Sequence, residues 1–166
     1  MTTPLNTTDL ADHLGESVRS CPIQLRNFGG VQKFAGQIAT VRCFEDNTEV
    51  RATLSTPGDR RVLVVDGGGS LNRALLGDNI AQLAIDNNWA GVIVHGAIRD
   101  SAEIAEMAIG VKALGTNSQK SRKEGLGVTN VNLVIGGIEF IPGEYVYSDA
   151  DGIVVTSDPV ELDDTE

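Results

Sequence analysis

Apolar residues recur at helical spacing in four segments of the chain, and this spacing predicts four short helices. The segments are residues 8–14, residues 48–54, a stretch of about ten residues that starts near residue 78, and a stretch that starts near residue 101. Residues that can cap a helix stand at each start: Thr8, then Asn47 or Thr48, then Asp78 or Asn79, and finally Ser101.

Short apolar runs, separated by glycine and proline turns, predict the strands. They cover residues 38–43, 62–65, 91–94, 111–114, 130–140 with a bulge or turn at Gly136 and Gly137, 145–147 and 153–156. Strands outnumber helices and the two kinds are mixed along the chain. We therefore expect a layered α/β domain with a mixed sheet rather than a doubly wound one.

The length and the charge distribution divide the chain into a domain and a tail. A chain of 166 residues is long enough for one domain with a real core and too short for two ordinary ones. Residues 1–123 carry equal numbers of acidic and basic residues, whereas residues 124–166 carry ten acids and no base. We expect a single domain over residues 1–157, followed by an acidic, disordered tail over residues 158–166.

The same charge distribution bears on the possible partners. Nucleic-acid binding requires clustered lysine and arginine, so the acidic last third argues against direct binding of nucleic acid. It would suit a basic protein partner instead. No apolar run approaches the roughly 18 residues that a membrane helix needs, and residues 1–6 lack the features of a signal peptide. We therefore expect no membrane association and a cytoplasmic location, in which Cys21 and Cys43 are reduced core residues.

A glycine-rich turn follows the strongest strand signal of the chain. Gly67 and Gly69 match the first half of the Gly-x-Gly-x-x-Gly pattern of dinucleotide-binding loops, but Asn72 stands where the third glycine belongs. No clear helix follows, and no Gly-Lys-Ser/Thr sequence is present. The sequence favours a tight turn that lets the backbone approach a neighbouring segment, and it speaks against nucleotide binding.

Three other candidate groups have simpler structural interpretations. His95 is expected to pack at a strand end rather than to act as a base. Lys112 has the chemistry for a Schiff base, but no neighbouring residue marks it as activated. The sequence Asp149-x-Asp151-Gly152 matches part of a calcium loop whose remaining ligands are missing, so a tight turn is the better interpretation.

The main candidate site lies in the stretch from Gly77 to Glu103. A helix followed by a strand folds the chain back on itself, which would bring Asp78 next to Arg99 and Asp100. Magnesium commonly takes one or two protein carboxylates together with water and substrate oxygens, and Asp100 with Asp78 and Glu103 nearby fits that pattern. The guanidinium of Arg99 suits a carboxylate or an enolate oxygen.

The peptide N–H groups that open the helix are a second anion-binding element. Gly77, Asp78, Asn79 and Ile80 would present these groups to a substrate carboxylate. Taken together, the stretch contains the parts needed to bind a 2-oxo acid and stabilise its enolate. The same residues would equally fit surface ion pairs and a simple helix cap, and the spacing alone does not decide between the two.

The motif Asp78-x20-Arg99-Asp100-x2-Glu103 resembles the signature of the RraA-like family, which includes metal-dependent 4-hydroxy-4-methyl-2-oxoglutarate aldolases. Similar sequence extends over roughly residues 8–157, through 64–67, 112–117 and 149–155. The chain resembles in particular the short actinobacterial members once labelled as demethylmenaquinone methyltransferases. A methyltransferase finds no support in the sequence, because no convincing cofactor-binding glycine motif is present.

The resemblance implies a swivelling-type β/β/α fold and a homotrimer with active sites at the subunit boundaries. It also implies that Asp100 ligates Mg²⁺ or Mn²⁺, that Arg99 holds the pyruvyl part of the substrate, and that Asp78 or Glu103 supports proton transfer. The implied reaction is retro-aldol cleavage of a 4-hydroxy-2-oxo diacid to two 2-oxo acids. Oxaloacetate decarboxylation would accompany it, because both reactions pass through the enolate of pyruvate.

The resemblance also implies a competing role without catalysis. Some family members inhibit the endoribonuclease that starts messenger decay by binding its basic region, and the acidic last third of this chain would suit that partner. The chain departs from longer members, whose C-terminal extension completes a neighbouring active site, because it ends in the acidic segment instead. Because of this departure, the sequence does not determine which residues form the far part of the substrate pocket or which substrate binds there.

Overall fold

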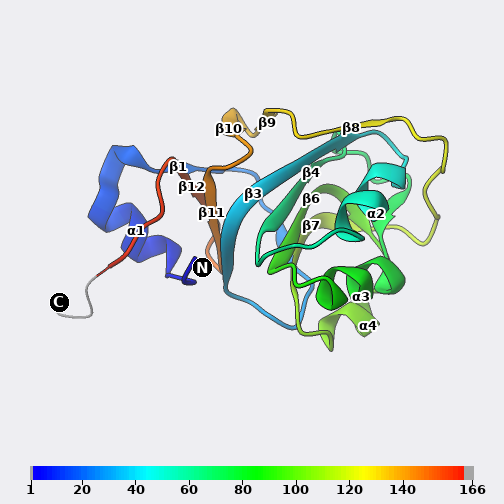
Figure 1. Cartoon of the computed structure of the whole chain (residues 1–166), viewed down its shortest axis with the longest axis horizontal. Helices are drawn as coiled ribbons and strands as arrows, with labels where there is room; N and C mark the ends of the chain where they lie inside the picture. The colour runs from blue at the N-terminus through cyan, green and yellow to red at the C-terminus, as the bar shows by residue number, and fades with distance from the viewer. Residues whose placement is uncertain (1, 163–166) are drawn as a thin grey trace.

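The computed structural model describes residues 2–162, which form a mixed α/β domain (Figure 1). The helices are α1 (Thr7–Leu14), the 3-10 turn η1 (Gly15–Ser17), α2 (Thr48–Leu54), α3 (Asp78–Asp86) and α4 (Ser101–Ala105). The strands are β1 (Arg19–Ser20), β2 (Arg26–Asn27), β3 (Phe34–Cys43), β4 (Val62–Asp66), β5 (Ala74–Leu76), β6 (Gly91–Ile98), β7 (Gly110–Thr116), β8 (Gly127–Thr129), β9 (Leu133–Ile135), β10 (Ile138–Phe140), β11 (Tyr145–Ser148) and β12 (Ile153–Thr156). All four predicted helices and the predicted mixed sheet are confirmed.

Several predicted elements have different lengths in the structure, and β3, for example, starts at Phe34 rather than at residue 38. Strand β6 extends to Ile98, about twice as far as the apolar run that predicted it, because its last two residues pair with β5. Helix α4, predicted to start near residue 101, ends already at Ala105 after five residues. The peptide N–H of Met107 donates to Ile104 O at 3.0 Å, so the chain closes a turn there instead of continuing the helix.

One continuous sheet has the strand order β1-β12-β11-β3-β4-β6-β7-β2. Strands β3, β4, β6 and β7 are mutually parallel, whereas β11, β12, β1 and β2 join them through antiparallel pairs. Strand β5 pairs in parallel with the end of β6, and β8 runs antiparallel beside the end of β3. The strands β9 and β10 form a separate hairpin.

Strand β3 belongs to both halves of this sheet. Its residues 34–37 pair with β11 and its residues 38–42 pair with β4, so one strand carries the chain from one β layer into the other. The ring of Phe34 fixes the junction. It lies so close to Gly91 and Gly110 that a Cβ atom on either residue would come within 2.4 and 2.1 Å of it, which leaves room there for glycine alone.

The parallel strands are buried on both faces, which explains their continuous apolar runs. Leu63 and Val65 of β4 pack toward the helices, against residues such as Leu54 and Ala84. Val64, between them, packs on the other face with residues of the β9–β10 hairpin, β11 and β12. The domain therefore has β, β and α layers in that order, as predicted, and Figure 1 shows α2, α3 and α4 together on one side of the sheet.

The first and last segments of the described chain meet on the outer side of β11 and β12. Leu10 of α1 packs with Tyr147 and Val154, and Val160 and Leu162 lie against the same cluster. The peptide N–H of Val160 also donates to the Tyr147 hydroxyl at 3.0 Å. Residues 158–162 of the predicted tail are thus in contact with the domain, whereas residues 163–166 lie outside the described residues. Within residues 2–162, no helix has the length and apolar character needed to cross a membrane.

Asp149 fastens α1 to the turn between β11 and β12. Its carboxylate accepts hydrogen bonds from the Thr7 N–H at 2.7 Å and the Thr7 hydroxyl at 2.8 Å, and from the N–H groups of Asp151 and Gly152. The tight turn expected here in place of a calcium loop is confirmed. Burial alone would raise the pKa of Asp149, but the hydrogen bonds outweigh burial and hold the pKa below its ordinary value.

This clamp predicts a pH-dependent contribution to stability. Because the folded pKa of Asp149 is lowered, its contribution is complete above the unfolded pKa of about 3.9 and is lost as the pH falls through the folded pKa. We expect Asp149→Asn to lower the free energy of unfolding by about 1.5–3 kcal/mol at pH 7, and by less below pH ~4. Urea unfolding of both proteins across this pH range measures the difference. An equal difference at all pH values would contradict the clamp.

A cleft at the carboxyl ends of β5 and β6

The candidate site forms where β5 and β6 end side by side. Leu76 pairs with Ile98, and the Arg99 N–H donates to Leu76 O at 2.9 Å. The chain leaves β5 through Gly77 into α3, and it leaves β6 through Arg99 and Asp100 into α4. These two exits line one cleft, so the prediction that the two ends of the central stretch meet is confirmed.

Asp100 turns away from its own helix. It has a left-handed backbone conformation, with φ 57° and ψ 41°, at the N-cap position of α4, but its side chain makes no capping bond there. Its Oδ2 instead accepts a hydrogen bond from the Asp78 N–H at the start of α3, at 3.0 Å. A carboxylate at that position satisfies a free N-terminal amide and interacts favourably with the helix dipole.

Of the four predicted caps, Asn47 alone occupies an N-cap position, and its side chain makes no capping hydrogen bond. Thr8 lies inside α1, and Asp78 and Ser101 are the first residues of α3 and α4 rather than their caps. The amide at the start of α2 bonds to the carboxylate of Asp46, one residue earlier than expected. The carboxylate that caps α3 comes from a distant part of the chain, which a rule based on local sequence does not detect.

Gly77 permits this arrangement by having no side chain. A Cβ atom on Gly77 would lie 2.8 Å from Asp100 Oδ2 and 3.5 Å from Arg99 Nε. The φ of Gly77 is −126°, which any residue adopts, so the requirement for glycine comes from space and not from backbone conformation. The predicted site residues Gly77, Arg99 and Asp100 thus interlock.

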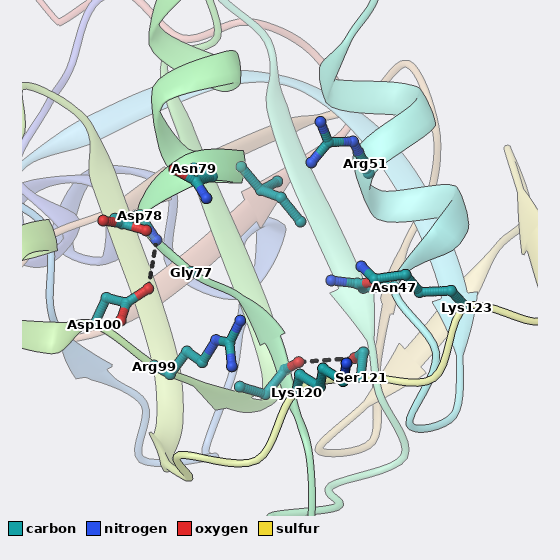
Figure 2. A pocket seen from close by; sticks show the side chains of 12 residues that line it. Asn47, Arg51, Gly77, Asp78, Asn79, Arg99, Asp100, Lys120, Ser121 and Lys123 are labelled. Carbon is teal, nitrogen blue, oxygen red and sulfur yellow. Dashed lines mark hydrogen bonds between the residues drawn. The ribbon is translucent and has the colours of Figure 1, made fainter.

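The cleft is rich in cations. Figure 2 shows Asp78 and Asp100 at one end of the cleft, Arg51, Asn47 and Lys123 at the other, and Arg99 between them, with Lys120 and Ser121 along one side. Among residues 2–162, the ion pairs within 4.0 Å are Arg19–Glu144 and His95–Asp66. The four cationic side chains of the cleft therefore have no carboxylate partner within that distance in the described part of the chain.

Several of these residues were not predicted as site residues. The segment with Lys120 and Lys123 lies between two predicted strands, and Arg51 was expected only to lie in a helix. In the structure, the segment with Lys120 and Lys123 contacts β5 and the first residues of α2. These contacts bring its lysines and Arg51 to the same cleft. The Ser121 hydroxyl donates to Ala74 O at 2.7 Å, and the Ala74 N–H donates to Gln119 O at 2.8 Å. The run of cations in the loop was the signal available in the sequence.

Glu103 and the other candidate groups lie outside the cleft. Glu103 is exposed on α4 and is not among the lining residues, so its catalytic role stays a prediction. His95 lies in β6 with its Nδ1 3.5 Å from Asp66 Oδ1, and the N–H groups of Gly67 and Gly69 both donate to His95 O. The glycine turn uses its amides within the protein and leads into β5, unlike a phosphate-binding loop. Lys112 is buried, with its Nζ 3.3 Å from Gly152 O.

The donor set of the cleft fits a hard divalent cation. In the described part of the chain, no three His, Cys, Asp or Glu side chains gather closely enough to hold a metal ion by themselves. Two carboxylates, those of Asp78 and Asp100, line the cleft. A zinc site would require more protein ligands, whereas Mg²⁺ or Mn²⁺ accepts one or two carboxylates and fills its remaining positions with water and substrate oxygens.

Comparisons with known proteins agree with this fold. Residues 7–155 match the family model described as RraA-like, Aldolase/RraA. A solved structure from Geobacillus kaustophilus, described as an S-adenosylmethionine:2-dimethylmenaquinone methyltransferase, is 51% identical with a TM-score of 0.91, over 92% of this chain and 95% of that one. A structure described as the RNA-processing inhibitor RraA from Thermus thermophilus is 45% identical, with a TM-score of 0.91 and 96% coverage of both chains.

A more distant structure shares the fold. Streptomyces coelicolor RraAS2, described as an unusual member of the RNase ES inhibitor RraA protein family, is 26% identical with a TM-score of 0.74, over 90% of this chain and 77% of that one. The Geobacillus protein is described as a methyltransferase, but the lining residues of the cleft described here include no glycine-rich loop of the kind that binds a nucleotide-like cofactor.

The contact between Asp100 and α3 predicts the exchange behaviour of one amide. Because the Asp78 N–H depends on the Asp100 carboxylate, we expect Asp100→Gly to speed its hydrogen exchange about tenfold. Glycine retains the left-handed backbone, so the substitution removes the carboxylate alone. The Ala81 N–H, which donates to Gly77 O within α3, is the internal control and should exchange as before. Exchange measured by NMR tests this, and an unchanged rate at Asp78 would contradict it.

Proposed function

Because the chain belongs to the RraA-like family, we propose that it is a divalent-metal-dependent lyase. It would cleave 4-hydroxy-4-methyl-2-oxoglutarate and similar 2-oxo acids to pyruvate by a retro-aldol reaction, and it would decarboxylate oxaloacetate through the same enolate. The observation that carries the proposal is the interlocked set of Gly77, Asp78, Arg99 and Asp100 at one end of a cationic cleft. A protein that only binds a partner has no need of this set.

The residues around Asp100 supply the binding site for the 2-oxo acid. Asp100 would hold Mg²⁺ or Mn²⁺, with Asp78 beside it. The bound ion would act as a Lewis acid and stabilise the negative charge that develops on the enolate oxygen. The hydrogen bond from the Asp78 N–H occupies one Asp100 oxygen and fixes the orientation of the carboxylate, leaving the other oxygen for the cation.

The guanidinium of Arg99 and the start of α3 orient the substrate. Arg99 lies beside Asp100, and its planar fork can pair with the carboxylate of the 2-oxo acid. The first amides of a helix have no acceptor within the helix, and the Asp78 amide is already used by Asp100. The amides of Asn79 and Ile80, which line the cleft, therefore remain for a substrate oxygen.

The bond changes require one proton acceptor and one proton donor. In the retro-aldol reaction the C4 hydroxyl loses its proton, the C3–C4 bond breaks, and its electron pair forms the enolate of pyruvate. The enolate then takes a proton at C3. We propose that Asp78, the second carboxylate of the cleft, accepts and returns that proton. In oxaloacetate the same bond breaks with release of CO₂.

Pyruvate release tests this function. With Mg²⁺ or Mn²⁺ we expect turnover of oxaloacetate and of 4-hydroxy-4-methyl-2-oxoglutarate, and loss of that turnover with EDTA. Arg99→Gln and Asp100→Asn are expected to lower kcat/KM about a hundredfold or more, because each removes an interaction with developing charge. Lys33→Ala removes an exposed cation that bonds to Asn6 and does not line the cleft, so it should leave the rate unchanged. Failure of the wild type to release pyruvate with any divalent metal would contradict the proposal.

A second function is favoured by the relatives. The Thermus protein, at 45% identity, is described as an RNA-processing inhibitor. Inhibition of a ribonuclease E-type endoribonuclease is therefore the alternative role for this chain, and the two roles are compatible. Asp100→Asn distinguishes them, since an inhibitor should retain its effect in this variant and lose it at high salt. For either role we expect a homotrimer, which light scattering can measure.

A further inference from the structure

The cleft has a second wall, opposite the carboxylates, that the proposed chemistry does not use. Asn47 is the N-cap of α2 and Arg51 lies four residues further along, so both lie on the same face of that helix. Figure 2 shows Arg51, Asn47 and Lys123 across the cleft from Asp78 and Asp100. We call Asn47, Arg51 and Lys123 the far wall.

The charges of the far wall are not neutralised by the protein. Neither Arg51 nor Lys123 has a carboxylate within 4.0 Å among residues 2–162, although the chain has 23 acidic residues and 13 basic ones. A basic residue in the last turn of a helix also stabilises the helix dipole, which is a simpler account of Arg51. That account explains neither the placement of Lys123, on a separate loop, in the same wall nor the clustering of both cations around one cleft.

A buried carboxylate holds the far wall in place. Asp46 is 1% exposed and immediately precedes Asn47. Its Oδ1 accepts a hydrogen bond from the Thr48 N–H at 3.0 Å, and its Oδ2 accepts one from the Glu124 N–H, directly after Lys123, at 2.6 Å. The Gly125 N–H also donates to the Thr48 hydroxyl at 3.3 Å. Asp46 therefore ties the first turn of α2 to the loop that carries Lys123.

The state of Asp46 agrees with this role. Burial by itself would raise the pKa of its carboxyl group, but hydrogen bonds from both segments hold the pKa below its ordinary value. The group is thus a charged, buried acceptor whose two oxygens serve two different segments. A residue that only capped α2 would require one of these contacts.

We propose that the far wall is a subsite for the second carboxylate of a diacid substrate, with Arg51 as its main specificity residue and Asp46 as its positioning residue. This inference rests on the proposed function, because the 2-oxo acid end must first be held by Arg99 and the metal at the other end. The three residues of the subsite are Asn47 at the N-cap position of α2, Arg51 of α2 and Lys123 of the β7–β8 loop. The subsite assigns to them the preference for a diacid over a monoacid.

The test compares two ligands that the enzyme cannot cleave. 2-Oxoglutarate and 2-oxobutanoate present the same 2-oxo acid end, and 2-oxoglutarate alone has a second carboxylate. Calorimetry in saturating Mn²⁺ should show that the wild type binds 2-oxoglutarate at least about tenfold more tightly than it binds 2-oxobutanoate. Arg51→Gln should reduce the affinity for 2-oxoglutarate to that for 2-oxobutanoate and leave 2-oxobutanoate binding unchanged. Asp46→Asn should reduce the same preference, and its thermal midpoint reports whether the fold survives.

Arg122→Gln is the matched control. Arg122 lies between Ser121 and Lys123 on the same loop but does not line the cleft, so this variant changes the net charge without touching the far wall. It should retain the full preference for 2-oxoglutarate. Equal binding of both ligands by the wild type, an equal loss of both in Arg51→Gln, or a loss of preference in Arg122→Gln would overturn the subsite and leave the proposed function standing. Failure of both ligands to bind with Mn²⁺ would overturn the proposed function and the subsite together.

Discussion

The parallel pairing of β5 with the end of β6 is the constraint on which the site depends. Parallel strands end at the same edge of a sheet, so the residues that follow them are brought together whatever their distance along the chain. Here the register of Leu76 against Ile98 places Gly77 beside Arg99 and Asp100. Shifting this register by one residue would reverse the facing of β5 and separate the start of α3 from the Asp100 carboxylate.

The conformation of Asp100 illustrates how that contact is maintained. A left-handed backbone costs an L-residue roughly 1–2 kcal/mol, although aspartate adopts it more readily than most. A hydrogen bond to a charged group contributes about 1.5–3 kcal/mol, and the positive end of α3 adds to it. The interaction with the Asp78 N–H is therefore large enough to offset the backbone cost. Left-handed geometry turns the carboxylate from its own helix toward the cleft, which a regular N-cap would not do.

Much of the frame of this site can be predicted from the sequence. The apolar runs of β4 and β6 and the helical spacing of α3 are local signals. A helix followed by a strand folds the chain back on itself, and this predicted that Asp78 and Arg99 would meet. The three residues of β5 are too few to give a strand signal, although all are buried. Arg51 and Lys123 are far apart in the sequence, and tertiary hydrogen bonds to Asp46 and Thr48 bring their segments together. The cap of α3 by Asp100 is likewise a tertiary contact, invisible to any rule that considers neighbouring residues.

The layers also separate the two proposed roles within one molecule. The cationic cleft lies on the side of the sheet covered by α2 and α3, whereas β11 and β12, in the segment without basic residues, lie in the other β layer. At physiological salt, exposed charges interact only weakly beyond about 8–10 Å. A ligand is therefore influenced mainly by the charges that lie close to its own binding site. A diacid in the cleft would experience mainly the four nearby cations, despite the net charge of −10. A basic partner would instead meet acidic residues of the segment after Lys123, none of whose described members lines the cleft, so catalysis and binding need not compete for the same residues.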